Sequence, residues 1–313
     1  MAARAKKLIF VCAFLVACGA SPIGLAQQSM RSASPRGLAP QTTGSRAQNA
    51  APKRIVSLVP ALTEMLFAIG AGPQVVAVSS YDEFPPAVKA LPRVGALLDP
   101  DVERILSLRP DLVITYGSQT ELEMQFARAK IRTFSYRHGG IAIVLQTMLD
   151  LGTVTGHAPD ADREVRAIRN RLEDIEKRVR GRTRPRTLLV FERQPRTLQQ
   201  MYVSGGRGFL HEMLESAGGA NVFADVSRES VQPSHETLLA RRPDVVLEVR
   251  AEGLLPPDEL REEQDVWSAL ASIPAVRNRR IHILNGQYLV VPGPRLAMAT
   301  EAFARALHPE AFK

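Results

Sequence analysis

Tyrosine side chains at the ends of predicted strands are the residues of this chain best suited to holding a ligand. Four of its five tyrosines, Tyr81, Tyr116, Tyr202 and Tyr288, lie in segments that border predicted buried strands. A tyrosine presents a flat apolar ring with one polar group, and ligand pockets are typically lined by such side chains. These positions therefore suggest a flat or bulky ligand. The alternative is that each ring packs beneath its own loop.

Motifs for covalent catalysis and for metal binding are missing from the sequence. We find no G-x-S-x-G elbow, no phosphate-binding P-loop and no H-E-x-x-H, and none of the six histidines is paired at i,i+4. Residues 205–208 (Gly-Gly-Arg-Gly) precede a predicted helix and either bind an anion or form a tight turn. A nucleophile with a positioned base cannot be identified, so we expect neither an enzyme nor a metal site.

Composition and charge exclude several other classes. The 313 residues suit two domains, and the net charge of +8 comes from basic residues scattered along the chain. Because no Lys/Arg-rich run alternates with aromatic residues, we do not expect nucleic-acid binding. The two cysteines, Cys12 and Cys18, both lie near the N-terminus, which leaves no disulfide framework for the folded part.

The N-terminus has the form of a secretion signal, which we assign to residues 1–26. A basic start leads into the apolar run 8–17, which is too short to span a membrane. Two cleavage sites compete. A lipobox would make Cys18 the lipidated first residue, whereas ordinary cleavage would follow Ala26. The polar residues 27–52 are predicted to form a disordered linker, and either cleavage places the protein outside the cytoplasm.

An internal repeat organises the rest of the chain. Residues 100–114 and 233–247 share the pattern P-x-x-E-x-[IL]-L-x-x-R-P-D-[LV]-V-[IL], with a constant offset of 133 residues. Each copy predicts a short helix that ends at Arg-Pro and leads into a buried strand. A second similarity, between residues 64–66 (Glu-Met-Leu) and 212–214, occurs in the same order. Two such matches indicate two similar lobes.

The predicted elements are typical of an α/β protein. Strands alternate with helices, which favours a parallel, doubly wound sheet in each lobe, and ligands of such sheets bind at the carboxyl ends of the strands. Residues 159–180 carry one apolar stripe with a charged opposite face, so they predict a single long helix. We expect an N-terminal lobe at 53–156, a connecting helix at 157–181 and a C-terminal lobe at 182–313.

Several of these motifs together resemble a known family. They are residues 54–64 (RIVSLVPALTE), Ser79-Ser80-Tyr81 and both E-x-[IL]-L-x-x-R-P-D units. They resemble the helical-backbone substrate-binding proteins of ABC importers, and among these the cobalamin binders most closely, over roughly residues 53–310. The resemblance implies two Rossmann-like lobes, one long connecting helix and a ligand cleft between the lobes.

The resemblance also implies roles for individual residues. Glu103 and Glu236 match the glutamates, one in each lobe, that dock onto arginines of the membrane permease. A carboxylate in a first helical turn is also favoured by the helix dipole alone. The positions that match the lining of a corrinoid cleft are Tyr81, Tyr116, Tyr202, Gln287 and Tyr288.

We therefore expect a periplasmic binding protein that delivers a cobalamin-like ligand to an inner-membrane permease and its ATPase. It would be a monomer without an intrinsic cofactor. The alternatives are a haem or iron–siderophore binder, with Arg193 and Arg207 as basic cleft residues, or less readily a sensor or enzyme on the same scaffold. The tryptophans that cobalamin binders carry before each P-x-x-E helix are replaced here by Leu97 and by Ser230-Val231.

Overall fold

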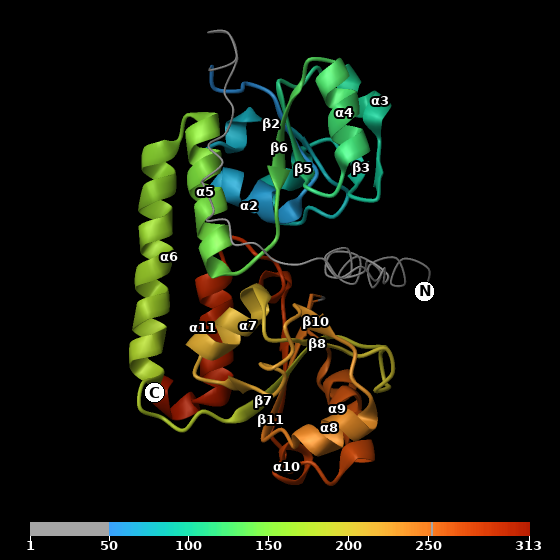
Figure 1. Cartoon of the computed structure of the whole chain (residues 1–313), viewed down its shortest axis with the longest axis vertical. Coiled ribbons are helices and arrows are strands. Elements are labelled where there is room, and N and C mark those ends of the chain that lie inside the picture. The colour runs from blue at the N-terminus through green and yellow to red at the C-terminus, as the bar shows by residue number, and fades with distance from the viewer. Residues whose placement is uncertain (1–49, 252) are drawn as a thin grey trace, which may run out of the picture.

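The computed structural model describes residues 50–251 and 253–313, so the predicted signal, Cys18 and most of the predicted linker lie outside the described residues. Two α/β lobes lie one above the other in Figure 1. The N-terminal lobe has a parallel sheet in the order β2-β1-β5-β6. Its strands are β1 (Ile55–Ser57), β2 (Val75–Val78), β5 (Leu112–Tyr116) and β6 (Arg132–Tyr136). The parallel sheet predicted for this lobe is confirmed.

The first helix of this lobe is α2 (Pro60–Ala68), which begins with a proline. Proline is well suited to the first helical position because an N–H group there has no intrahelical acceptor, so the N–H that proline lacks is not missed. The other elements are α3 (Val102–Ser107), α4 (Thr120–Arg128), α5 (Ile141–Thr155), the 3-10 helices η2 (Gly72–Gln74) and η3 (Pro86–Ala90), and the hairpin β3 (Gly95–Ala96) with β4 (Asp99–Pro100).

The C-terminal lobe has a mixed sheet in the order β10-β8-β7-β11-β12, with β9 beside β7. The expected parallel arrangement holds for β7, β9, β11 and β12, but β8 runs antiparallel to β7. Residues 193–201 join β7 to β8 and are fewer than the dozen or so that a parallel crossover needs. The strands are β7 (Arg186–Glu192), β8 (Tyr202–Ser204), β9 (Ala220–Asn221), β10 (Ser230–Val231), β11 (Val245–Arg250) and β12 (Ile281–Asn285).

Five α-helices and three 3-10 helices complete the described part of this lobe. They are α7 (Gly208–Ser216), α8 (His235–Arg241), α9 (Pro257–Asp265), α10 (Pro274–Arg277), α11 (Leu296–Leu307), η4 (Val266–Leu270), η5 (Gln287–Leu289) and η6 (Pro309–Phe312). The helix predicted to follow the glycine-rich residues 205–208 is confirmed as α7. Trp267, in η4, is fully buried and belongs to the core of this lobe.

The predicted long helix is α6 (Ala158–Val179), and it runs along one side of both lobes (Figure 1). It packs against α5 and α11 through the buried stripe Val165, Ile168, Leu172, Ile175 and Val179. One continuous apolar cluster extends from the N-terminal lobe, through α5 and α6, into the C-terminal lobe. Because a large hinge motion would expose part of this cluster to water, the two lobes are restrained relative to each other.

The Arg-Pro-Asp part of the repeat joins each short helix to its sheet. Asp111 accepts hydrogen bonds from the backbone N–H groups of Lys53 (2.9 Å) and Arg54 (3.0 Å), directly before β1. The Arg54 guanidinium in turn donates to the carbonyl oxygen of Leu108 at the end of α3 (2.8 Å). A cation at a helix C-terminus satisfies a carbonyl group that has no intrahelical partner.

The second copy repeats these contacts. Asp244 accepts from the N–H of Arg186 (3.1 Å), and the Arg186 guanidinium donates to the carbonyl oxygen of Arg241 (2.6 Å). In both copies the arginine before the proline has left-handed backbone angles, with φ 48° at Arg109 and 49° at Arg242. The repeated phrase therefore encodes the same local structure twice.

Two glutamates, Glu64 and Glu212, make contacts across the boundary between the lobes. Glu64 in α2 forms a bidentate ion pair with Arg295, directly before α11 (2.8 and 2.5 Å). Glu212 in α7 accepts a hydrogen bond from the N–H of Ile141, the first residue of α5 (2.5 Å). The two glutamates occupy equivalent positions in the repeat, so each lobe sends one carboxylate to the start of the other lobe's last helix.

The ion pair between Glu64 and Arg295 provides a test of this arrangement. We expect Glu64→Gln to lower the free energy of unfolding by about 2–3 kcal/mol, because it leaves a largely buried guanidinium without its anion. The control is Glu301→Gln, which breaks a more exposed i,i+4 pair with Arg305 and should cost about 0.5 kcal/mol or less. Urea unfolding measures both variants, and equal effects would contradict the cross-lobe role.

Candidate functional site

The carboxyl ends of the strands in each lobe face the other lobe. Helices α2 and α5 begin directly after β1 and β6, and both contact the C-terminal lobe through Glu64 and Ile141. From the other side, α11 and α7 supply the partners Arg295 and Glu212. Figure 1 shows the chain leaving β6 toward the lower lobe before α5 begins. The edges at which the sequence predicted ligand binding therefore meet at the boundary between the lobes.

Tyr81 stands on a well-ordered turn after β2. Its N–H donates to Ser79 Oγ (3.3 Å), while the Asp82 carboxylate accepts from the Ser79 N–H (2.9 Å) and hydroxyl (2.6 Å). Arg93 donates to the carbonyl oxygens of Ser79 and Asp82 (2.9 and 2.7 Å). Burial raises the pKa of Asp82 to about 6. These contacts hold Tyr81 half-buried in a fixed position on the carboxyl edge of the sheet.

Tyr116, the last residue of β5, is only 4% exposed. It begins a series of edge-to-face ring contacts that crosses the lobe boundary through Tyr136 (5.7 Å between centroids), His138 (6.2 Å) and Phe209 (5.3 Å). Most of the Tyr116 ring therefore packs in the interlobe core. The interpretation that this tyrosine lies beneath its own loop fits this placement better than a large ligand contact.

The three predicted ligand residues of the C-terminal lobe are half-buried at the facing edge. Tyr202 is the first residue of β8 and pairs with Glu192, the last residue of β7, so the antiparallel direction of β8 keeps Tyr202 at this edge. Gln287 and Tyr288 lie in η5 directly after β12. The ring of Tyr288 is 5.9 Å from the guanidinium carbon of Arg295, which belongs to the cross-lobe ion pair.

The prediction that Arg193 is a basic cleft residue is wrong. Its side chain is buried and forms ion pairs with Glu248 (3.0 Å) and Glu263 (2.8 Å). A fully paired guanidinium has no remaining capacity to neutralise an anionic ligand. Arg207 is exposed, directly before α7, and stays a candidate.

The glycine-rich loop before α7 has the shape of a tight turn. A Cβ atom at Gly205 would lie 2.2 Å from the carbonyl oxygen of Arg228, and one at Gly206 would lie 2.1 Å from that of Ala224. Close backbone packing thus explains both glycines without an anion. Of the two interpretations that the sequence left open for residues 205–208, the structure favours the turn.

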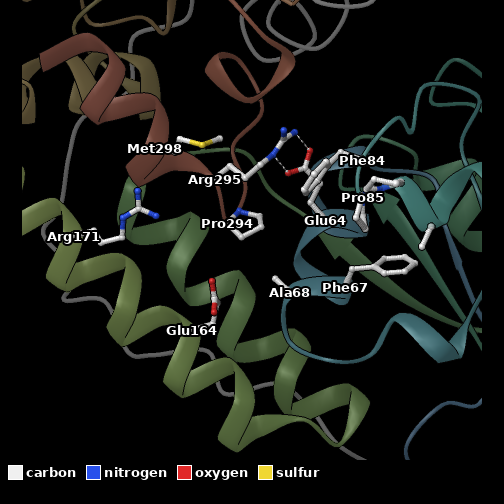
Figure 2. Close-up of a pocket in the computed structure, with 12 residues that line it drawn as sticks. Glu64, Phe67, Ala68, Phe84, Pro85, Glu164, Arg171, Pro294, Arg295 and Met298 are labelled. Atoms are coloured by element: carbon white, nitrogen blue, oxygen red, sulfur yellow. Dashed lines mark hydrogen bonds and ion pairs between the residues drawn. The ribbon is translucent and has the colours of Figure 1, made fainter. Parts of the chain in front are cut away.

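A pocket of about 540 Å³ lies at the same boundary, on the side of α6 (Figure 2). Its walls come from α2, the loop at Phe84, α6 and the start of α11, and they are largely apolar. Arg295 stacks on the ring of Phe84 (4.0 Å) and pairs with Glu64, whose pKa is raised by burial against the opposing effect of Arg295. The predicted ligand tyrosines are not among its lining residues. Its volume suits a drug-sized molecule rather than a corrinoid.

Glu103 and Glu236 lie in the first turns of α3 and α8 and are exposed. Each helix is capped by a different residue, since Asp101 accepts from the N–H of Arg104 (3.0 Å) and Ser234 from that of Thr237 (3.2 Å). Within the described part of the chain, neither glutamate forms an ion pair with another side chain. The local fold therefore does not use these carboxylates for capping, and they remain available for a partner.

Sequence reasoning overlooked two leucines with highly exposed side chains. Leu98, at the tip of the β3–β4 hairpin, is 71% exposed, and Leu254, in the loop after β11, is 88% exposed. The hairpin tip lies beside the carboxyl end of β5, because the side-chain amide of Gln119 donates to the carbonyl oxygen of Leu97 (2.7 Å). A leucine in the sequence gives no sign of whether it is buried, so only the structure identifies this pair.

In residues 50–251 and 253–313, no group of three or more His, Cys, Asp or Glu side chains is arranged to hold a metal ion. In the same residues, no helix is both long and apolar enough to cross a membrane.

The fold and the paired strand edges define a two-lobed substrate-binding protein of ABC importers, and comparison with known proteins agrees. The model of the periplasmic binding protein family matches residues 55–288, and the chain belongs to this family. It is 30% identical over 268 residues to YvrC of Bacillus subtilis, described as an uncharacterized ABC transporter substrate-binding lipoprotein, covering 84% of this chain and 82% of YvrC.

Two further relatives carry more specific names. The vitamin B12-binding protein of Salmonella typhimurium is 28% identical over 256 residues, which covers 81% of this chain and 90% of the relative. The structure of the periplasmic heme-binding protein RhuT from Roseiflexus sp. RS-1 has a TM-score of 0.69 at 28% identity and covers 83% and 99% of the two chains. These relatives are transport proteins, so the expectation that the chain is not an enzyme is confirmed.

The buried His138 predicts a measurable pH dependence. Burial lowers its pKa to about 4, whereas the unfolded chain takes up this proton near pH 6.5. Stability should therefore fall by up to about 3 kcal/mol as the pH drops from 6.5 to 4. Chemical unfolding of wild type and of His138→Gln at several pH values tests this, because the variant should lack this component.

Asp82 changes the stability in the opposite direction over a similar pH range. Because its pKa is raised to about 6 in the folded chain, protonation of Asp82 increases the stability as the pH falls from 6 toward 3.8. Because Asp82 is present in both proteins, its contribution cancels in the comparison. The Glu229 carboxylate, 3.5 Å from His138 Nε2, favours the protonated ring and therefore makes the loss of stability smaller. Parallel stability curves for wild type and His138→Gln would show that His138 is not a source of the acid-side loss.

Proposed function

We propose that this protein captures a cobalamin-like corrinoid between its lobes and delivers it to an inner-membrane permease and ATPase. The observation that carries the proposal is the pair of facing strand edges, which present Tyr81 from one lobe and Tyr202, Gln287 and Tyr288 from the other. Aromatic rings with polar tips on two opposed edges suit a large, flat ligand with a polar rim.

The charges near this edge bear on the choice of ligand. Haem and many ferric siderophores are anionic chelates and need cations, whereas the rim of a corrinoid is rich in neutral amides. Of the two arginines expected to serve an anionic ligand, Arg193 is already paired with Glu248 and Glu263. Exposed apolar side chains at Leu98 and Leu254 add apolar surface. These features support the corrinoid over the alternatives, a haem or an iron–siderophore.

The predicted signal at the N-terminus supports export of the protein from the cytoplasm. Export directs the chain out of the cytoplasm, and Cys18 becomes a lipid anchor if the lipobox is used, as the lipoprotein description of the relative YvrC supports. We further propose that the mature protein acts as a monomer without an intrinsic cofactor. Since α6 and the shared core restrain the lobes, closure on the ligand is small.

Calorimetric titration with cyanocobalamin, haemin and a panel of ferric siderophores tests the ligand. We expect cyanocobalamin to bind most tightly, and Tyr81→Ala or Tyr288→Ala to weaken it by about tenfold or more, as loss of a buried aromatic contact does. Met124→Ala, an exposed change on α4, serves as the control and should leave affinity unchanged. If the folded protein binds haemin or a siderophore instead, the corrinoid assignment is wrong; if it binds none of the three, so is the whole ligand class.

Docking to the permease is tested by charge reversal. The combined change Glu103→Lys and Glu236→Lys should abolish association with the cognate permease–ATPase complex in nanodiscs, because it replaces the two exposed carboxylates by cations. Ligand affinity should stay at the wild-type value. Loss of ligand affinity would instead assign the glutamates to the ligand site.

A further inference from the structure

Each short helix of the repeat exposes one leucine at the same position. Leu106 in α3 is 41% exposed and Leu239 in α8 is 39% exposed, and they are 133 residues apart, like the repeat itself. Each follows its glutamate, Glu103 or Glu236, by three residues. Residues three apart on a helix share a face, so each helix presents a carboxylate and an apolar side chain side by side.

The aliphatic residue before each leucine is buried instead of exposed. Ile105 and Leu238 are fully buried and hold their helices against the sheets. The fold therefore needs an apolar residue at this first position but not at the second. A single exposed leucine is ordinary in a soluble protein. Of the exposed large apolar side chains in the described residues, only Leu106 and Leu239 are related by the 133-residue offset of the repeat.

We propose that Leu106 and Leu239 form, with Glu103 and Glu236, two equivalent docking patches, each a carboxylate beside an apolar side chain. This inference rests on the proposed docking function and extends it from charge to shape. The partner must offer two equivalent surfaces, each with a cation next to an apolar hollow. A permease assembled from two like halves would present two such equivalent surfaces.

The two parts of a patch have separate tasks. The carboxylate attracts its cation over a distance and sets orientation, an effect that salt screens. The leucine adds contact only after it is desolvated, and this contribution is insensitive to salt. The guanidinium groups of Arg54 and Arg186 hydrogen-bond the C-terminal ends of the two helices, so both patches are fixed relative to their sheets.

The experiment measures binding of the full protein to the cognate permease–ATPase complex in nanodiscs, by biolayer interferometry at several salt concentrations. The test variant is Leu106→Ser with Leu239→Ser. The matched control is Met124→Ser, an exposed apolar residue on α4 outside both patches. Leu106→Gln with Leu239→Gln provides a second test variant of similar size and helix propensity, in case the serine variant is unstable.

We expect the leucine variants to bind the permease about tenfold or more weakly, mainly through faster dissociation, with an unchanged salt dependence. Met124→Ser should bind like wild type, and cyanocobalamin affinity should not change in any of them. If Glu103→Lys with Glu236→Lys abolishes docking while both leucine variants dock normally, the leucine inference is overturned and the docking function stands. If wild type itself does not bind the permease, the proposed docking function fails.

Discussion

Two reciprocal carboxylates and the apolar core between them determine how the lobes sit. Glu64 reaches from the first helix of the N-terminal lobe to the start of α11, and Glu212 reaches from the equivalent helix of the C-terminal lobe to the start of α5. The Glu64 contact is buried, and the Glu212 contact is part-buried. Unpairing the buried Glu64 carboxylate is costly, so the fold favours one interlobe geometry over a range of open forms. The spacing of the two facing edges is therefore already set.

The repeat shows why both lobes present the same features on their surfaces. In each lobe an aspartate fixes the start of the first strand, an arginine at the start of that strand holds the end of the short helix, and a proline prevents the helix from continuing. The position of the glutamate at the other end of that helix follows from these contacts. Because the motif occurs in both lobes, each lobe presents an equivalent surface around its short helix.

Periodic and repeated features of this sequence predicted the fold well, and context-dependent ones did not. The stripe of α6 and the paired short helices depend on local spacing, which a sequence displays directly. The direction of β8 depends on the short loop that joins it to β7, and the ion pairs of Arg193 depend on Glu248 and Glu263, 55 and 70 residues away. The exposure of Leu98, Leu106 and Leu239 is a property of packing, which the residue type cannot report. The ligand contacts of the four tyrosines stay predictions.

Topology relates the ligand edge to the docking patches. In a strand–helix–strand unit the helix runs back against the strands, so its N-terminus lies at the carboxyl edge of the sheet. The first turns of α3 and α8, with Glu103 and Glu236, thus border the edge that carries the tyrosines. Figure 1 shows α6 along one side of the lobe boundary, with α3 and α8 on the opposite side. Since α6 closes its own side, a ligand bound between the edges as proposed would enter and leave on the side of α3 and α8. A partner that binds both patches would therefore cover this opening, so docking and ligand release would share one path.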